Sequence, residues 1–120
     1  MSPKLRELYT LFDKLNAEFF NNKLLKVRIL LEKRAKTYDG LYCCHYMHGL
    51  PDPKRLDEAT ITIHKDCWGG CGNPNTVLGT LLHEMIHQYQ AEVLKRKCNH
   101  DAIFVSIAKR GERMYGVPVR

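Results

Sequence analysis

Two histidines and a glutamate stand in an order that could bind and use a metal ion. His83, Glu84 and His87 spell H-E-x-x-H within the apolar stretch Leu78–His87. On a helix of about 3.6 residues per turn, side chains four positions apart share a face, so both imidazoles would point at one spot, as two ligands of a single Zn²⁺ must. Glu84 lies one position around the helix, where it could reach a metal-bound water without being a ligand itself. The spacing therefore predicts a hydrolytic metal site with Glu84 as its general base.

The residues around the motif favour this interpretation over a chance arrangement. Most faces of the expected helix carry apolar side chains, from Val77, Leu78, Leu81, Leu82, Met85 and Ile86. A glutamate and two histidines buried among them cost free energy unless something compensates them, and a metal ion is the simplest compensation. The alternative is a set of surface residues or hydrogen-bonded core groups.

A catalytic zinc normally has three protein ligands and one open position, so a third ligand is expected elsewhere in the chain. His100 follows His87 by thirteen residues, across a turn that could fold a last helix back on the metal helix. The alternatives are Glu112 and three upstream histidines: His45, His48 and His64. The longer metzincin motif is absent, because position 90 is Gln and position 93 is Val.

The elements that must position these side chains can be predicted from periodicity. Ser2-Pro3 is typical of a helix start, Leu5 to Phe19 repeat at helical spacing, and Asn21-Asn22 should end that helix. Strands are expected at 27–31, within 37–46 and at 59–64, with a loop at 49–57. In the last strand, strict alternation predicts Ile61 and Ile63 in the core, and Thr60, Thr62 and His64 facing outward.

The second half of the chain reads as two helices. Asn73-Pro74 should open the metal helix, which is expected to run to about Lys95. Asn99 or Asp101 could cap the last helix, which Gly111 should weaken and 116–118 should stop. Its expected inner side consists of Ile103, Phe104, Ile107 and Ala108. The order of elements predicts an α+β domain, with a small, mainly antiparallel sheet packed on three helices.

Length and composition fit one domain over residues 1–120 of ordinary globular type. The chain has no apolar stretch near the ~20 residues of a membrane span. Its first seven residues lack the apolar core of a secretory signal. We therefore expect an intracellular protein, cytoplasmic or associated with the nucleoid or nucleus, unless a signal is missing from the sequence.

Five cysteines exclude a fully paired disulfide framework, and reduced thiols are the favoured interpretation. The alternative is a second, structural zinc site made by Cys67, Cys71 and either Cys43 or Cys44, but this spacing is irregular for zinc.

The net charge of +6 is concentrated in two clusters. Residues 23–36 carry six basic residues against one acidic residue, and residues 95–120 carry seven against two. Such clusters suit a polyanion such as nucleic acid, although a solvated basic surface without a partner is the alternative. The residues expected to contact DNA are Lys33, Arg34, Lys36, Lys95, Arg96 and Lys97, with Trp68 as a stacking platform for single strands.

Three segments resemble a known family, the SprT-like (Spartan-type) metalloprotease domains. Leu81–His87 is close to that family's metal helix, and Asn99–Phe104 is similar to its downstream His-Gly-x-x-Phe element, with Asp101 in place of the usual glycine. Leu15–Leu24 is similar to its N-terminal helix and Phe-rich turn. Together these segments span most of the chain.

The resemblance implies a zincin-like fold with a central metal helix, Zn²⁺ on His83, His87 and His100, and Glu84 as general base. It also implies proteolysis of proteins bound or crosslinked to DNA, a role in DNA repair. Several relatives carry a C-terminal zinc ribbon or another DNA-binding tail, and this chain ends at Arg120 without one. If the chain is complete, DNA affinity is expected from the protease domain itself, and this affinity is expected to be weak and independent of sequence.

Two other functions remain open. One is a zinc-containing DNA- or protein-binding module without proteolytic activity, and the other is a hydrolase of small peptides unrelated to DNA. For a protease, the 59–64 strand could hold an extended substrate if it is an edge strand. A residue that helps the oxyanion could be Tyr42, Tyr46, Tyr89 or His64, although ordinary packing is the simpler role for each tyrosine.

Overall fold

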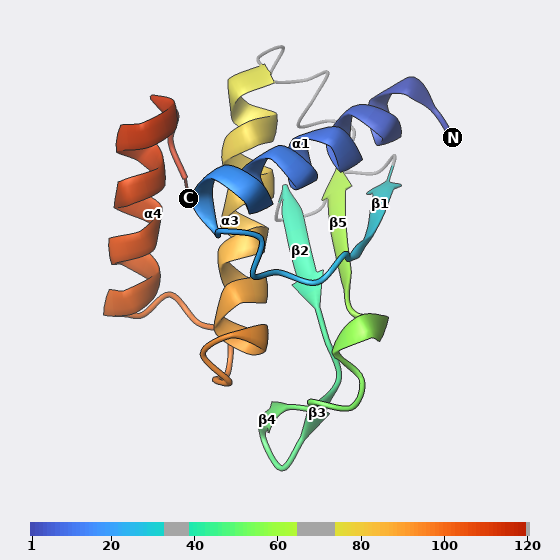
Figure 1. Ribbon diagram of the computed structural model, residues 1–120, viewed down its shortest axis with the longest axis vertical. Coiled ribbons are helices and arrows are strands. Elements are labelled where there is room, and N and C mark those ends of the chain that lie inside the picture. The colour runs from blue at the N-terminus through green and yellow to red at the C-terminus, as the bar shows by residue number, and fades with distance from the viewer. Residues whose placement is uncertain (33–38, 65–73, 120) are drawn as a thin grey trace.

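The computed structural model describes residues 1–32, 39–64 and 74–119, with the side chains of residues 74–76 left out. Three α-helices, one short 3₁₀ helix and five strands lie in these ranges: α1 (Pro3–Phe19), β1 (Arg28–Glu32), β2 (Gly40–Cys43), β3 (Tyr46–Met47), β4 (Leu50–Pro51), η1 (Leu56–Glu58), β5 (Thr60–His64), α3 (Pro74–Glu92) and α4 (Ala102–Tyr115). Figure 1 shows α1 lying across the sheet, α3 beside β2, and α4 antiparallel to α3.

The domain is α+β, as predicted, but its sheet is mixed. The strand order is β1-β5-β2, in which β1 runs parallel to β5 and β2 runs antiparallel to it. The prediction of a mainly antiparallel sheet is therefore wrong. A parallel pair requires a crossover connection, and here that connection contains β2 and the small β3–β4 hairpin. Local sequence patterns carry no signal for such a long-range arrangement.

β5 is the central strand of the sheet, and this overturns two predictions. Ile61 and Ile63 are buried as expected, but Thr62 and His64 are also buried, at 8% and 1% exposure. Their outward orientation was predicted from alternation, which holds only when one face of a strand meets water. β5 also has β1 and β2 on its two sides, so it is not an edge strand.

The first helix begins and ends as predicted. The Ser2 side chain accepts a hydrogen bond from the Leu5 N–H at 3.2 Å, and Pro3 occupies the first turn. Asn21 and Asn22 then adopt positive φ angles of 53° and 60°, which turn the chain away from the helix. The buried Asn16 side chain holds that turn by bonding both backbone groups of Leu24.

The metal helix begins at Pro74, as predicted, but ends at Glu92 rather than Lys95. Lys95 has a φ of +57°, and the Arg96 N–H returns to the Gln90 carbonyl at 3.0 Å, which closes the helix earlier. The connector of residues 93–101 then leads into α4, which runs back along α3 (Figure 1).

The last helix is capped by Asp101, whose side chain accepts a hydrogen bond from the Phe104 N–H at 2.9 Å. Phe104 and Ala108 are buried as expected, whereas Ile103 is 41% exposed, so its inward placement was wrong. The helix continues through Gly111 to Tyr115. Gly111 allows close packing, because a Cβ at this position would lie 2.6 Å from Leu82 Cδ2.

Among the described residues, none of the helices combines the length and the apolar character needed to cross a membrane.

Candidate metal centre

Three imidazoles converge between α3 and the start of α4. His83 and His87 lie one turn apart on α3, and His100 arrives from the connector just before α4. His100 Nε2 lies 3.1 Å from His87 Nε2 and 3.2 Å from His83 Nε2. One ligand atom from each ring lies within 4.8 Å of the other two. The folding back of α4, expected from the turn after α3, is what brings His100 to the pair.

The donor set fits a tetrahedral zinc ion. Ligand nitrogens at 2.0–2.1 Å from a tetrahedral centre lie roughly 3.3 Å from one another, close to the two shortest separations here. Burial lowers the pKa of His87, the Gln90 side chain raises it by a smaller amount, and nearby His100 lowers it. A lowered pKa favours the neutral imidazole, which is the form that coordinates a metal. This group of three histidines could therefore bind a metal ion.

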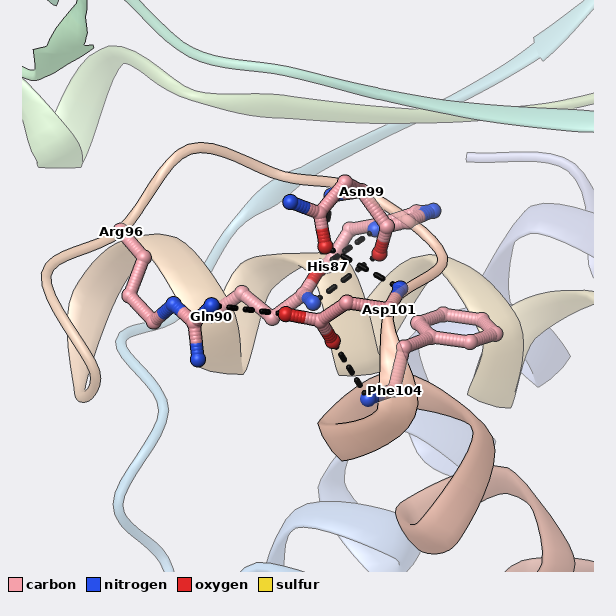
Figure 2. A network of polar contacts seen from close by, with 6 residues as sticks. All are labelled: His87, Gln90, Arg96, Asn99, Asp101 and Phe104. Carbon is pink, nitrogen blue, oxygen red and sulfur yellow. Dashed lines mark hydrogen bonds and ion pairs between the residues drawn. The ribbon is translucent and has the colours of Figure 1, made fainter.

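Gln90 orients one ligand and holds the connector that carries another (Figure 2). Its Oε1 lies 2.8 Å from His87 Nδ1, so Nδ1 carries the proton and Nε2 keeps its lone pair for a metal. The amide nitrogen of Gln90 donates to the Asn99 carbonyl at 3.0 Å, and Oε1 also accepts the Asn99 N–H at 3.4 Å. One buried side chain thus links His87 to the residue before His100.

Further contacts fix the connector. The Cys98 thiol donates to the His87 carbonyl at 3.2 Å, and Arg96 forms a 2.7 Å ion pair with Asp101. The Phe104 ring lies 4.6 to 4.9 Å, between centroids, from the rings of all three histidines. The three imidazoles therefore rest on an apolar support that limits their rotation.

Glu84 lies beside the histidines and is 6% exposed. Its Oε2 is 3.9 Å from His83 Nε2, and the carboxylate accepts a hydrogen bond from the backbone N–H of Tyr42. Burial raises the pKa of Glu84 to about 7, and the Tyr42 bond only partly opposes this shift. A carboxyl with this pKa exchanges its proton near neutral pH.

The carboxylate faces a hollow of about 560 Å³. One wall is β2, and the others are α3 with its two histidines and the connector at Cys98, Asn99 and His100. Gly40 lets β2 approach α3 closely, because a Cβ there would lie 2.9 Å from Thr80 Cγ2 and 3.2 Å from Glu84 Cγ.

The alternative ligands do not join the group of three histidines. His45 is exposed and contacts Arg55, His48 lies in the β3–β4 turn with a φ of +55°, and His64 is buried at the end of β5. Glu112 accepts a hydrogen bond from the Val119 N–H at 3.1 Å. In the part of the chain that the structure describes, no second group of three His, Cys, Asp or Glu side chains comes together in this way.

The three tyrosines named as possible oxyanion helpers take varied positions. The Tyr42 hydroxyl is buried, and burial followed by the neighbouring Cys44 raises the pKa of this phenol above its ordinary value. Burial also raises the pKa of Tyr46, with Cys98 as the next cause, and the Tyr89 ring packs against Phe20 at 5.7 Å.

Of the residues expected to contact DNA, the structure describes Lys95, Arg96 and Lys97. Lys95 and Lys97 are exposed, whereas Arg96 is engaged with Asp101. Lys33, Arg34, Lys36 and Trp68 lie outside the described residues, as do Cys67 and Cys71 of the alternative structural zinc site. Cys43, Cys44 and Cys98 are free thiols.

Sequence reasoning missed Gln90, Gly40, Cys98 and Asn99. Two of them gave a usable signal: Gln90 lies three residues after His87 on the same helix face, and a glycine inside a strand pattern often marks a close backbone approach. Cys98 gave none, and Asn99 was noted only as a possible cap and as part of the family element, because the contacts of both residues depend on how the connector folds.

A comparison with protein families identifies the family of this chain. A model of the SprT-like family matches residues 8–120, which include the metal helix and the connector to α4. Compared with curated proteins, the chain gives no significant match. Because the family match covers nearly the whole chain, this protein belongs to the SprT-like family and is a metalloprotease-like domain.

Proposed function

We propose that this domain is a zinc-dependent endopeptidase in which His83, His87 and His100 hold the metal and Glu84 is the general base. The observation that carries the proposal is the position of Glu84, a buried carboxylate 3.9 Å from one of three convergent imidazole nitrogens. A purely structural site would not need a costly buried carboxyl at this point.

A bound zinc ion would supply Lewis-acid chemistry, making water acidic enough to act as a nucleophile near neutral pH and polarising a carbonyl. Glu84 takes the proton of the attacking water and delivers it to the leaving amine. The Tyr42 N–H orients the carboxylate for both transfers, and a pKa of about 7 suits a group that must accept and release a proton. Gln90 keeps the ring of His87 in the tautomer that offers Nε2.

The peptide substrate is held along β2, which takes the role that the sequence suggested for β5. The Asp39 carbonyl accepts the His64 N–H, so Asp39 is in a hydrogen-bonded position of the antiparallel pair β2–β5. Hydrogen-bonded and non-hydrogen-bonded positions alternate along such a pair, so the backbone groups of Gly40 and Tyr42 point away from β5. These groups lie on the side of β2 that lines the hollow. Because Glu84 already accepts the Tyr42 N–H, the N–H and C=O of Gly40 and the C=O of Tyr42 are the groups that would pair with a substrate. An extended chain bound there would be fixed by backbone hydrogen bonds and could be cleaved with little regard to its sequence.

The substrates we propose are proteins bound or crosslinked to DNA. Support comes from the SprT-like family match and from the clustered positive charge of a domain with a net charge of +6. Exposed Lys95 and Lys97 lie on the connector next to His100, so a bound nucleic acid would lie near the proposed catalytic centre.

The two alternatives predict different outcomes in one cleavage experiment. The purified protein is incubated with a DNA-binding protein substrate, with and without DNA, and Glu84→Gln serves as the matched inactive control. The proposal predicts zinc-dependent cleavage that increases when DNA brings enzyme and substrate together. Cleavage indifferent to DNA would favour a general peptide hydrolase, and no cleavage by a zinc-loaded protein would favour a binding module.

A further inference from the structure

A second cavity adjoins two of the three histidines. It has a volume of about 430 Å³, and His83 and His100 form part of its lining. Most of its wall is apolar: Phe104, Val105 and Ala108 from α4, and Val119 from the C-terminal segment. Lys109 and Glu112 complete the lining.

The wall of this cavity is held in place by specific contacts. The Glu112 carboxylate accepts the Val119 N–H at 3.1 Å, after Gly116 has turned the chain in the left-handed region at a φ of +69°. Gly79 allows the segment to lie directly on α3, because a Cβ at position 79 would lie 2.1 Å from the Pro118 carbonyl oxygen. Val117 and Val119 are buried as a result. The pocket is therefore formed before any ligand arrives.

We propose that this pocket binds the side chain of one substrate residue next to the scissile bond, and that it selects a large apolar side chain such as Phe, Leu or Met. The inference rests on the proposed function. Two lining residues are also proposed metal ligands, so a peptide whose carbonyl reaches the metal centre brings a neighbouring side chain close to this pocket. Consecutive side chains of an extended peptide point to opposite sides, so one of them enters while the next points away.

The chemistry of the lining decides the class of side chain. The volume lies within the usual range of ligand pockets, and an aromatic or long aliphatic group would displace water from the apolar wall. The two charged lining residues, Lys109 and Glu112, carry opposite signs, so the lining has no net charge that would select a charged side chain. Backbone pairing along β2 would hold any sequence, and this pocket would supply the preference.

Two substitutions on α4 give a matched test. Val105 and Ile103 are both 41% exposed, but only Val105 lines the pocket. Val105→Trp should fill the pocket, while Ile103→Trp adds the same side chain to the same helix outside it. Circular dichroism and thermal melting would check that both variants fold.

The first readout is cleavage of a peptide mixture, with cleavage sites mapped by mass spectrometry. The wild type and Ile103→Trp should favour large apolar residues at one position adjacent to the cut. In Val105→Trp, kcat/KM for a Phe-containing peptide should fall by tenfold or more, because one methylene in an apolar pocket changes kcat/KM by roughly 10- to 200-fold. Cleavage at Ala or Gly should be retained. Absence of any apolar preference in the wild type, or equal profiles for the two variants, would overturn the proposal.

The second readout does not depend on cleavage. Zinc-loaded Glu84→Gln is titrated with two blocked hexapeptides that differ only in one Phe or Ala, and binding is followed by calorimetry. The pocket predicts tighter binding of the Phe peptide, and this preference should be lost when Val105→Trp is added but kept with Ile103→Trp. Such a result would support the pocket even if the wild type cleaved nothing. Absence of cleavage would then refute the proposed function alone. Equal binding of the two peptides would refute the pocket.

Discussion

The side-chain oxygen of Gln90 lies 2.8 Å from Nδ1 of His87, which lies about one turn earlier on the same helix. Gln90 also bonds the Asn99 backbone, so one residue sets the tautomer of one proposed ligand and the position of the loop that carries another. Ligand orientation of this kind often governs metal affinity as much as the ligands themselves.

Replacing Gln90 should therefore weaken zinc binding without removing a ligand. Gln90→Leu keeps the approximate volume but loses all three hydrogen bonds, and we expect zinc affinity to fall by about 10- to 100-fold. Affinity can be measured by competition with a chromogenic chelator. Gln88→Leu is a matched control, because Gln88 is an equally buried glutamine on α3 that bonds Leu25 and Glu92 instead. A similar loss of zinc affinity in both variants would attribute the effect to general destabilisation.

Glu84 should make the metal-free protein less stable as pH rises. Its pKa is raised from 4.5 to about 7 in the folded state, so the folded protein binds a proton more tightly than the unfolded chain does. The stabilisation from that proton is complete below about pH 4.5 and is lost as pH rises through 7. At 1.36 kcal/mol per pKa unit, the change is at most about 3 kcal/mol.

Glu84→Gln isolates this effect, because the amide does not titrate and every other group is shared. In chelator-treated protein, urea unfolding at pH 5 and pH 8 should show the variant gaining stability relative to wild type at the higher pH. A gap between the two proteins that is the same at both pH values would contradict the burial of an ionisable Glu84.

Gly40→Ala should disturb catalysis while leaving the metal in place. The new Cβ would lie 2.9 Å from Thr80 Cγ2 and 3.3 Å from Glu84 Oε2, so the carboxylate or β2 must shift. Displacing a catalytic group by about 1 Å can cost ~100-fold in rate, and we expect a loss of activity approaching that size with normal zinc content. Adding Thr80→Ser removes the closest methyl group and should restore part of the activity. Unchanged activity in Gly40→Ala would show that Glu84 tolerates the contact.

DNA binding remains a prediction that needs its own test. Reversing the charges of Lys95 and Lys97 should weaken binding to single-stranded DNA, as measured by fluorescence polarisation. The slope of log affinity against log salt concentration should also become shallower by roughly 0.7 for each lost phosphate contact. Arg96 is left unchanged, because its ion pair with Asp101 holds the connector. Reversal of Lys33, Arg34 and Lys36, or Trp68→Ala, tests the second cluster and the proposed stacking residue.

Reversal of Lys14 and Lys54 controls for net charge, since both are exposed and lie outside the two basic clusters. Equal weakening in this control would mean that only overall charge matters. No binding by the wild type at tens of micromolar protein would separate the domain from DNA targeting.

The sequence predicted local features well and long-range features poorly. The Ser2-Pro3 and Asn73-Pro74 signals located two helix starts, and Asp101 was named as a possible cap, because caps depend on neighbouring residues. The burial of Thr62 and His64 was missed, because it depends on what covers the second face of β5, which the pattern of residues 59–64 does not reveal. His83 and His87 could be paired by helical spacing alone. His100 was one of several candidates until the family resemblance singled it out, and Gln90 needed the folded connector.

The most direct test of the account measures zinc content and proteolysis together in the wild type, Glu84→Gln and His100→Ala, and measures the zinc content of His64→Ala and Glu112→Ala for comparison. Metal is quantified by mass spectrometry after dialysis, and cleavage is followed on an unfolded protein substrate. We expect one zinc per chain in the wild type and in Glu84→Gln, a loss of cleavage of ~100- to 10,000-fold or more in Glu84→Gln, and a sharp loss of zinc in His100→Ala. Near-wild-type cleavage by Glu84→Gln, or full zinc content in His100→Ala together with its loss in His64→Ala or Glu112→Ala, would contradict the proposed centre.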